Sequence, residues 1–446
     1  MTFQIYTLGC KVNTYESNVI EEQLQKQGYQ LTDGPADIVI INTCTVTNTA
    51  DRKSMKMIHR IHKEYPQALL VVIGCMSQIR ADEVKELPNV IIVLGNKYKS
   101  KLPALIEQYM HDRQPIVLVE DLMQTTFETM RLDNFNRTRA FVKIEDGCEN
   151  FCSYCIIPYS RGNVRSKAPL DVIDEVKTLV KMGHHEIVLT GIHTGHYGAE
   201  FEAYQFADLL RDLLNIPGLE RLRISSIEMN EITDEVLQLL QSSSILVDHF
   251  HIPLQSGSDS ILKAMNRKYD KQAFIEKVAA IRKVRPRISL TTDLIVGFPG
   301  ETEEYFLETL DTIRHLKFSK IHVFPYSKRQ GTKAALLPDI DGTTKKQRVR
   351  TVLELSRQLE QEYMTQFLGE TVTVIPEVER HGYWLGHTGN YLAVKVPVTK
   401  AGMPDEITVV LNEVAYPYMI GEVKKVSEHQ SSEVADKIQS EQKLEI

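Results

Sequence analysis

The first 112 residues alternate short apolar runs with amphipathic stretches. Apolar runs of strand length lie at residues 3–9, 36–43, 68–74 and 89–95. Stretches with the helical period lie at residues 15–27, 51–65 and 99–112. Continuous apolar strands that alternate with helices are typical of a parallel sheet covered on both faces. The pattern therefore predicts an α/β domain over residues 1–112, built on a doubly wound parallel sheet.

A second alternation begins after a polar, irregular stretch at residues 113–138, which we expect to be a linker. Six further strand-like runs lie at residues 140–147, 186–193, 222–228, 248–255, 288–298 and 320–327. The first five are each followed by a helical stretch, and one more helix is predicted at residues 343–366. Because a complete eight-unit barrel usually needs about 250 residues, this segment predicts a partial (βα)6 barrel over residues 139–366.

Beyond Gly369 the apolar period changes to two. Strand-like runs lie at residues 370–379, 391–399, 405–415 and 420–426. Short strands of this kind predict a small β-barrel over residues 367–430. The last residues, 431–446, are polar, and we expect them to form a tail.

Composition adds an expected compartment and a use for the cysteines. The chain has 446 residues, a net charge of −7 and 42% hydrophobic residues, which is typical of a globular protein of two or three domains. Its N-terminus has no signal pattern, and no run approaches about 18 apolar residues, so we expect a cytoplasmic protein without a membrane segment. In the cytoplasm, the six cysteines are expected to bind metal or take part in catalysis rather than to form disulfides.

Three cysteines form a compact C-x3-C-x2-C run directly after the first strand of the second alternation. They are Cys148, Cys152 and Cys155. Thiolates are the usual ligands of iron–sulfur clusters, and three of them leave one iron of a 4Fe-4S cluster free for a small molecule. A structural zinc site normally needs a fourth ligand, and no Cys or His stands at finger spacing. Buried thiols without a ligand are the other alternative, which the closeness of three cysteines disfavours.

The other three cysteines are far apart in the sequence, but each one ends a predicted strand. They are Cys10, Cys44 and Cys75. The carboxyl ends of parallel strands meet at one edge of a sheet, so these thiols are expected to lie close together. Each alone is typical of a small buried residue, whereas the three together favour a second cluster. The residues expected to donate hydrogen bonds to it are Asn13, Asn42, Thr43 and Ser77.

The compact cysteine run in this context resembles that of the radical S-adenosylmethionine (SAM) enzymes. The resemblance implies a 4Fe-4S cluster whose open iron binds SAM, which is split into methionine and a 5′-deoxyadenosyl radical. The segments LTGIHTG, RISSIE, HIPLQSGSD and DLIVGFPGET resemble the strands that hold SAM. On that resemblance, the residues expected to bind SAM are Gly191, Ser225, Ser226, Glu228, Gln255 and Gly297. No catalytic residue is predicted beyond the cluster ligands.

The order of the predicted domains resembles that of the methylthiotransferases. These enzymes combine an N-terminal cluster domain, a radical SAM barrel and a C-terminal TRAM β-barrel. The resemblance implies two 4Fe-4S clusters, the second of which carries or provides sulfur. One SAM molecule methylates that sulfur, and another generates the radical that activates the target carbon. An electron donor and a sulfur source are further implied partners, which the sequence does not identify.

Two segments resemble the branch that modifies N6-threonylcarbamoyladenosine in tRNA. They are GCKVNTYES, with Lys11, Val12 and Glu16, and GHTGNY at residues 386–391. The implied reaction adds a methylthio group to C2 of that nucleoside at position 37 of tRNA. A different tRNA adenosine or a ribosomal protein side chain is the alternative substrate. An iron–sulfur carrier or RNA-binding protein without turnover is the alternative from another class, which the SAM-pocket segments disfavour.

Charge alone does not locate an RNA surface. Residues 328–357 hold eight basic and three acidic residues, and the helix at 51–65 is also basic, but a solvated face explains such runs equally well. The final β domain is slightly acidic, so specific stacking contacts are expected there instead. The candidates for RNA contact are Arg161, Arg165, Tyr383, His387, Asn390 and Tyr391. Trp384, the single tryptophan, suits the core and an RNA contact equally.

Overall fold

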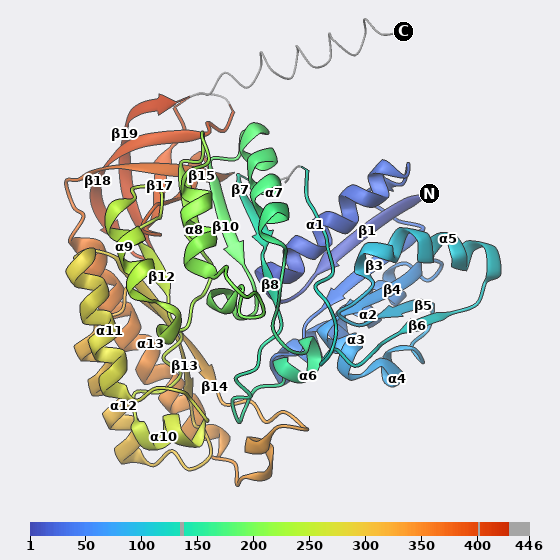
Figure 1. Ribbon diagram of the computed structural model, residues 1–446, viewed down its shortest axis with the longest axis horizontal. Helices are drawn as coiled ribbons and strands as arrows, with labels where there is room; N and C mark the ends of the chain where they lie inside the picture. Colours follow the sequence, from blue (N-terminus) through green and yellow to red (C-terminus); the bar gives the residue numbers. More distant parts are fainter. Residues whose placement is uncertain (134–137, 400–401, 428–446) are drawn as a thin grey trace, which may run out of the picture.

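The computed structural model describes residues 1–133, 138–399 and 402–427. Its N-terminal part is a six-stranded parallel sheet with the order β2-β1-β3-β4-β5-β6 (Figure 1). The strands are β1 (Thr2–Thr7), β2 (Gln30–Leu31), β3 (Ile38–Thr43), β4 (Leu69–Gly74), β5 (Val90–Leu94) and β6 (Ile116–Leu118). The helices are α1 (Lys11–Lys26), α2 (Asn48–Glu64), α3 (Cys75–Ile79), α4 (Ala81–Val84) and α5 (Leu102–Asp112). The predicted doubly wound sheet is confirmed, with short edge strands β2 and β6 added.

The apolar runs of this sheet are buried on both faces. Every residue of β3 and β5 is buried. On one face, Val39 and Ile41 pack with Ile58 and Ile61 of α2. The other face belongs to a core that continues into the central barrel. The β-branched runs thus form central strands because helices or the barrel cover them on each side.

The stretch predicted as a linker is partly built into the fold. β6 lies inside it and pairs with β5. Met130 and Leu132 are buried in the main core, and the hydroxyl of Tyr15 donates to the Met130 carbonyl oxygen at 2.7 Å. Isolated apolar residues in a polar stretch were enough to anchor it, although they form no periodic pattern.

The central part is the predicted six-stranded partial barrel. Its strands are β7 (Arg139–Lys143), β10 (Glu186–Thr190), β11 (Arg221–Ile224), β12 (His249–His251), β13 (Ser289–Val296) and β14 (Lys320–Pro325). They form two parallel three-stranded arcs, β7-β10-β11 and β12-β13-β14. The arcs are joined where the Ile227 amide donates to the His251 carbonyl oxygen at 3.0 Å. A short antiparallel pair, β8 (Glu145–Asp146) and β9 (Arg165–Ser166), follows β7.

Helices cover the outside of the barrel (Figure 1). They are α7 (Pro169–Lys181), α8 (Phe206–Leu214), α9 (Asp234–Ser242), α10 (Asp259–Ala264), α11 (Lys271–Val284), α12 (Glu303–Leu316) and α13 (Gly342–Thr365). The short helix α6 (Ile157–Arg161) lies instead next to α3 of the N-terminal part. The helix predicted at residues 343–366 is α13, which begins at the cap Asp341, whose side chain accepts from the amides of Thr343 and Thr344.

The C-terminal part is a closed five-stranded barrel. Its strands are β15 (Thr371–Arg380), β16 (Tyr383–Thr388), β17 (Ala393–Pro397), β18 (Glu406–Ala415) and β19 (Tyr418–Ser427). The sequence pattern missed β16 because its buried positions are Trp384, Gly386 and Thr388 rather than aliphatic residues. Trp384 is 1% exposed and belongs to the core of this barrel, which removes it from the candidates for RNA contact. The predicted tail at residues 431–446 lies outside the described residues.

The C-terminal barrel is held against the central barrel by ion pairs between strands. Arg139 of β7 pairs with Glu377 of β15 at 2.9 Å, and Arg221 of β11 pairs with Glu406 of β18 at 2.8 Å. Figure 1 shows the three parts side by side, with the N-terminal sheet and the C-terminal barrel both beside the central barrel. Among the described residues, no helix has the length and apolar character needed to span a bilayer.

Candidate functional site

The compact triad lies in the loop between β8 and α6, at the carboxyl end of β7. The loop begins at Gly147, whose φ is +96° and where a Cβ would stand 1.9 Å from a neighbouring carbonyl oxygen. The Cys148 amide donates to the Gly162 carbonyl oxygen, and the Cys155 amide to that of Cys152, each at 3.0 Å. The loop directs all three thiols into one space of about 330 Å³, the cluster cavity.

Burial opposes the deprotonation of two of these thiols. It raises the pKa of Cys155 to about 12 and also raises the pKa of Cys152. Arg267 acts to lower the pKa of Cys152, because its Nη1 donates to the Cys152 Sγ at 3.4 Å. Metal ligation needs thiolates, and bound iron would compensate the charge that burial disfavours. Three thiols at one cavity, one of them beside a guanidinium, therefore fit an iron–sulfur cluster.

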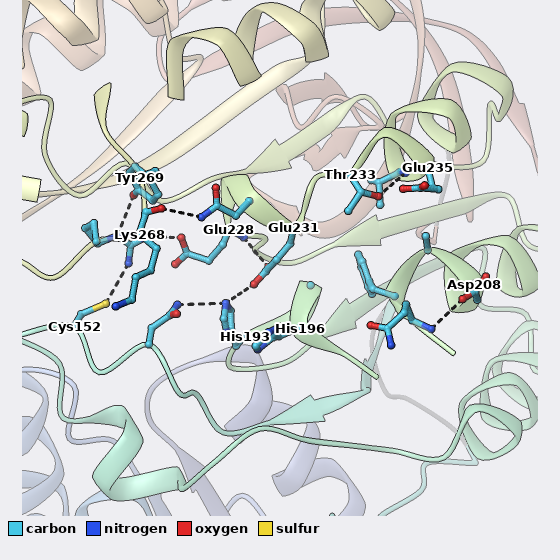
Figure 2. A pocket seen from close by; sticks show the side chains of 18 of the residues that line it. Cys152, His193, His196, Asp208, Glu228, Glu231, Thr233, Glu235, Lys268 and Tyr269 are labelled. Carbon is cyan, nitrogen blue, oxygen red and sulfur yellow. Dashed lines mark hydrogen bonds and ion pairs between the residues drawn. The ribbon is translucent and has the colours of Figure 1, made fainter. Parts of the chain in front are cut away.

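His193 adds a fixed positive charge beside Cys148. Burial opposes its protonation, but hydrogen bonds with Cys148 and Glu231 raise the pKa of the imidazole to about 11. Figure 2 shows His193 facing Glu231 at the edge of a second space, of about 650 Å³. His193, Cys152 and Glu228 line both this space and the cluster cavity, so the two adjoin.

Three of the six residues expected to bind SAM line the cluster cavity with the cysteines. They are Ser226, Glu228 and Gln255. Glu228 is paired with Arg267, the same side chain that contacts Cys152. Asp293 and Ile295 also line this cavity; they lie on β13, in the segment DLIVGFPGET that resembles a SAM-holding strand. Phe324 and Tyr326 line it too and were not predicted, although the end of β14 at Pro325 was the available signal.

The other three expected SAM residues lie elsewhere. Gly191 follows β10, and a Cβ there would stand 2.6 Å from Glu145 Oε2. Gly297 follows β13, and a Cβ there would stand 2.4 Å from the Lys345 side chain of α13. Ser225 lines a separate cavity between the domains. In this structure the two glycines serve the close packing of neighbouring elements.

The dispersed triad comes together at the carboxyl edge of the N-terminal sheet. Cys10 caps α1, Cys44 follows β3, and Cys75 begins α3. Gly9 has a φ of +106°, and a Cβ there would stand 2.9 Å from the Cys44 Cβ and 3.2 Å from its Sγ. Burial and the nearby Cys75 raise the pKa of Cys44 to about 11. The chain thus keeps side chains away from the thiols at the point where they converge.

Two side chains that the sequence analysis did not assign to this cluster donate to Cys75. Arg161 Nε lies 3.3 Å and Asn96 Nδ2 lies 3.4 Å from the Cys75 Sγ. Asn13, which was expected to donate, gives its amide hydrogens to the Leu8 and Thr43 carbonyl oxygens. Asn42 and the Thr43 hydroxyl also donate to backbone carbonyl oxygens. Asn96 follows β5, so its place at a strand end was the available signal.

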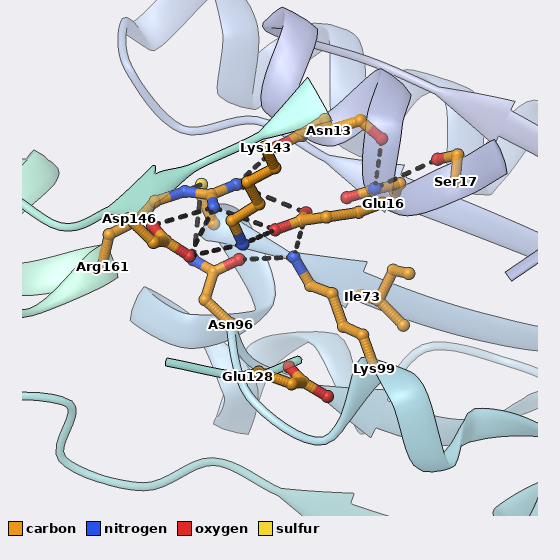
Figure 3. A network of polar contacts seen from close by, with 12 residues as sticks. Asn13, Glu16, Ser17, Ile73, Asn96, Lys99, Glu128, Lys143, Asp146 and Arg161 are labelled. Carbon is orange, nitrogen blue, oxygen red and sulfur yellow. Dashed lines mark hydrogen bonds and ion pairs between the residues drawn. The ribbon is translucent and has the colours of Figure 1, made fainter. Parts of the chain in front are cut away.

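A buried ion network lies behind the dispersed triad and joins two domains (Figure 3). Glu16 of α1 pairs with Lys143 at 2.8 Å and Arg161 at 3.0 Å, and also with Lys99. Asp146 pairs with Lys143 at 2.7 Å and Arg161 at 3.1 Å. Burial opposes the ionisation of Glu16, but Arg161, Lys143 and Lys99 hold the pKa of its carboxyl well below its usual range. Cations outnumber carboxylates in this network, which favours thiolates nearby.

The segment that follows one cysteine of the dispersed triad reaches the cluster cavity. Val46 and Thr47, which follow Cys44, line the cluster cavity with the compact triad. In residues 1–133, 138–399 and 402–427, no three His, Cys, Asp or Glu side chains are placed to hold a single metal ion. Thiolates that bind different irons of one cluster stand further apart than ligands of a single ion. The thiol ligands, which are of the type that iron–sulfur clusters use, make the two triads candidate cluster sites.

Replacing Gly9 by alanine should disturb the dispersed triad and spare the compact one. A non-glycine residue at this φ, with its Cβ against Cys44, is expected to cost about 1–3 kcal/mol. We expect the reconstituted variant to bind less iron than the wild type and to retain SAM cleavage. Gly28→Ala is the matched control, because Gly28 has a φ of +85° but no atom within 4 Å of its Cβ position. Equal iron content in both variants would refute the expectation.

Two of the candidates for RNA contact are buried. Arg161 is 0% and Arg165 is 6% exposed. Arg161 belongs to the ion network, and Arg165 pairs with Asp146 at 3.2 Å and donates to the Arg161 carbonyl oxygen. Their position just after the compact triad suggested a contact with RNA. In the structure, both side chains are instead buried and form ion pairs with Asp146.

The four candidates on the C-terminal barrel have different surroundings. Tyr383 lies beneath Lys395, whose Nζ is 4.0 Å from its ring centroid. Asn390 donates to the Tyr363 hydroxyl at 3.1 Å. His387 and Tyr391 are stacked, with ring centroids 4.8 Å apart, and line a cavity between the domains. Tyr383 is therefore separate from the pair that faces this cavity.

In comparisons with known proteins, each triad lies in a segment that matches a different family. Residues 142–313 match the radical SAM superfamily, and residues 2–95 match an uncharacterized protein family, UPF0004. The chain is 43% identical to the threonylcarbamoyladenosine tRNA methylthiotransferase MtaB of Bacillus subtilis, over 97% of this chain and 98% of that protein. It is 36% identical to the tRNA-2-methylthio-N(6)-dimethylallyladenosine synthase of a Thermoanaerobacter species, over 84% of this chain and 82% of that protein.

A solved structure supports the fold. The radical SAM methyltransferase TsrM from Kitasatospora setae aligns with a TM-score of 0.53 at 14% identity, over 73% of this chain and 74% of that chain. At this identity the likeness concerns the fold alone.

Proposed function

This chain belongs to the tRNA methylthiotransferase family of radical SAM enzymes, and we propose that it adds a methylthio group to C2 of N6-threonylcarbamoyladenosine at position 37 of tRNA. The relative named for that nucleoside matches nearly the whole chain at 43% identity. A relative named for a dimethylallyl nucleoside matches at 36% over 84% of the chain. The difference in identity and coverage favours the threonylcarbamoyl branch.

The observation that carries the proposal is that parts of the chain next to both triads meet at one cavity. Transfer of a sulfur-containing group to a carbon requires a radical source and a sulfur carrier at one target atom. The compact triad lines the cluster cavity, and the segment after Cys44 forms part of its wall. A chain that only carried clusters would have no need to bring the two sites to a common space.

The compact triad would hold the first 4Fe-4S cluster, and the dispersed triad would hold a second one. When bound, the first cluster supplies the electron that splits SAM, and the second holds the sulfur to be transferred. Ser226, Glu228 and Gln255 line the cluster cavity and would orient SAM there. Arg267 neutralises Glu228 and contacts Cys152, which keeps both groups fixed. Arg161 and Asn96 donate to Cys75 and thereby stabilise its thiolate.

The cations of residues 328–357 divide into two groups. Arg329 pairs with Asp51 at 2.8 Å, Lys345 with Asp339 and Arg348 with Glu301, so these three serve the fold. The exposed cations, which we propose as phosphate contacts, are Lys328, Lys333, Lys346, Arg350 and Arg357. An electron donor and a sulfur source complete the set of partners that the reaction needs.

Inactivation of the gene should remove one nucleoside from tRNA. In a host without a second such enzyme, we expect 2-methylthio-N6-threonylcarbamoyladenosine to disappear and N6-threonylcarbamoyladenosine to accumulate. Mass spectrometry of digested tRNA measures both. A plasmid copy should restore the product, and a copy with Cys152→Ala should not. Loss of a 2-methylthio-dimethylallyl nucleoside instead would assign the chain to the other branch, and an unchanged profile would refute the proposal.

A further inference from the structure

A cavity of about 340 Å³ lies where the three parts of the chain meet. Lys11 of α1 reaches it from the N-terminal part, Arg223 and His249 from the central barrel, and His387 and Tyr391 from the C-terminal barrel. We refer to it as the interdomain cavity. The compact triad, the segment after Cys44 and the proposed SAM contacts Ser226, Glu228 and Gln255 line the cluster cavity instead, so the proposed chemistry leaves the interdomain cavity without an occupant.

The lining of the interdomain cavity carries cations that its carboxylate does not balance. Its cationic side chains are Lys11, Arg223 and Lys320, and its one carboxylate, Glu360, pairs with Lys320 at 3.1 Å. Among the described residues, Lys11 forms no ion pair with a carboxylate. Arg223 pairs with Glu186 outside this lining, so Lys11, which is partly buried, is the cation that the carboxylates of the described residues leave unpaired. Withdrawing an unpaired cation from water is costly unless an anion is nearby.

Arg223 is the clearest sign of a ligand. It is 1% exposed, and its Nε donates to Glu186 at 2.6 Å. Its Nη1 and Nη2 are buried and have no hydrogen-bond partner within the described part of the chain, and the same holds for Nδ1 of His249. A guanidinium presents donors in a fixed fork that matches a carboxylate or a phosphate. Two unused donors on a buried guanidinium at a cavity wall therefore suit an anionic ligand.

The residues around Tyr391 also make this part of the cavity electrostatically positive. Its ring stacks on His249 and on His387 with centroids 4.8 Å apart in each pair, and the Arg223 guanidinium lies 4.5 Å from its centroid. Burial raises the pKa of a phenol, but Arg139, Lys11 and Arg223 lower the pKa of Tyr391 below its usual value. Two further histidines in the lining, His251 and His322, add no negative charge.

The interdomain cavity adjoins the cluster cavity. His251 lines the former and Asp293 lines the latter, and the His251 Nε2 is 3.5 Å from the Asp293 Oδ1. The neighbours Ser225 and Ser226 also divide between the two cavities. Lys11 directly follows Cys10 of the dispersed triad. The two cavities are therefore neighbours that meet at the His251–Asp293 contact. A nucleoside bound across this boundary would have its reacting carbon in the cluster cavity and a side group in the interdomain cavity.

We propose that the interdomain cavity binds the carboxylate of the threonylcarbamoyl group, with Arg223 and Lys11 as the cations that recognise it. This inference rests on the function proposed above. The two segments that resemble the threonylcarbamoyl branch, at Lys11 and at residues 386–391, are far apart in the sequence, yet both reach this cavity. A neutral dimethylallyl group would leave the cations unpaired, so the same residues would also discriminate against that nucleoside.

An anion in this cavity could come from the nucleoside or from a backbone phosphate, and RNA binding distinguishes the two. The probes are anticodon stem-loops that carry threonylcarbamoyladenosine, its neutral methyl ester or unmodified adenosine at position 37. Fluorescence anisotropy with the reconstituted full-length protein gives the dissociation constants. We expect the wild type to bind the carboxylate-bearing stem-loop about tenfold to a hundredfold more tightly than the other two. Lys11→Met should remove most of this preference, and Lys11→Arg should keep it.

Two further variants make the test specific. Lys346→Met removes an exposed cation of α13 and should change the binding of all three stem-loops by the same factor. Arg223→Lys keeps the charge, lacks the fork and is remote in sequence from the cysteines, so it should weaken the preference even if Lys11→Met loses iron. Equal weakening of all three stem-loops by Lys11→Met would identify a phosphate and overturn the proposal, as would an unchanged preference in both variants.

The proposed function is checked separately in the same preparations. If the wild type adds a methylthio group to the threonylcarbamoyl stem-loop and the variants keep their preference, only the role of the interdomain cavity fails. If the wild type modifies another adenosine instead, the proposed substrate fails and the cavity proposal falls with it.

Discussion

Replacing Cys152 by alanine is expected to abolish the reductive cleavage of SAM. Cys152 lines the cluster cavity, and its Sγ is held 3.4 Å from Arg267 Nη1. Removing one of three thiolates leaves too few ligands to hold a cluster whose fourth iron must stay open. The measurement is the 5′-deoxyadenosine formed by the anaerobically reconstituted variant with reductant and SAM, compared with that formed by the wild type.

Cys44→Ala is the matched control, because it removes a thiol of the other triad by the same substitution. Cys44 does not itself line the cluster cavity, so SAM cleavage should persist while the methylthiolated product is lost. Thermal unfolding of both variants checks that each is folded. Loss of SAM cleavage in both variants would contradict separate roles for the two triads.

Replacing Arg161 by methionine should cause the largest loss of stability. Arg161 is completely buried and pairs with Glu16 at 3.0 Å and Asp146 at 3.1 Å. Methionine fills part of the space but leaves two buried carboxylates with fewer cations, so the free energy of unfolding should fall by about 3–5 kcal/mol. Urea denaturation of the apoprotein measures this change without a contribution from the clusters.

Arg314→Met provides the comparison for an exposed ion pair. Arg314 pairs with Asp311 at 2.7 Å on the outer face of α12, and the same substitution there should cost no more than about 1 kcal/mol. Similar losses for the two variants would show that the network around Arg161 contributes no more than a surface pair. Such a result would contradict a stabilising role for the buried charges.

The strands could be predicted where burial required continuous or alternating aliphatic residues. β3, β4 and β5 contain continuous apolar runs because both faces of the N-terminal sheet are covered. β16 was missed because Gly386 and Thr388 occupy two of its buried positions. β6 was missed because only three residues pair at an otherwise irregular edge. Periodicity thus detects strands with aliphatic buried faces and fails where small or polar residues fill them.

The site was predictable only as far as local rules reach. The carboxyl ends of parallel strands bring Cys10, Cys44 and Cys75 to one edge, and no knowledge of the other domains is needed for that. The burial of Arg161 was not predictable, because it depends on Glu16, which belongs to another domain. The interdomain cavity has the same origin, since three separate parts of the chain supply its lining. Long-range packing decides which polar residues face solvent, and sequence spacing does not contain that information.

The shared charges of α1 and the barrel constrain how relatives of this protein can be recombined. Glu16 meets Lys143 and Arg161, which stand 127 and 145 positions later in the chain. A hybrid that takes its first hundred residues from one parent and the remainder from another would bury a carboxylate from one lineage against cations from the other. Grafting between divergent parents must therefore transplant these positions as one block, although they belong to different structural units.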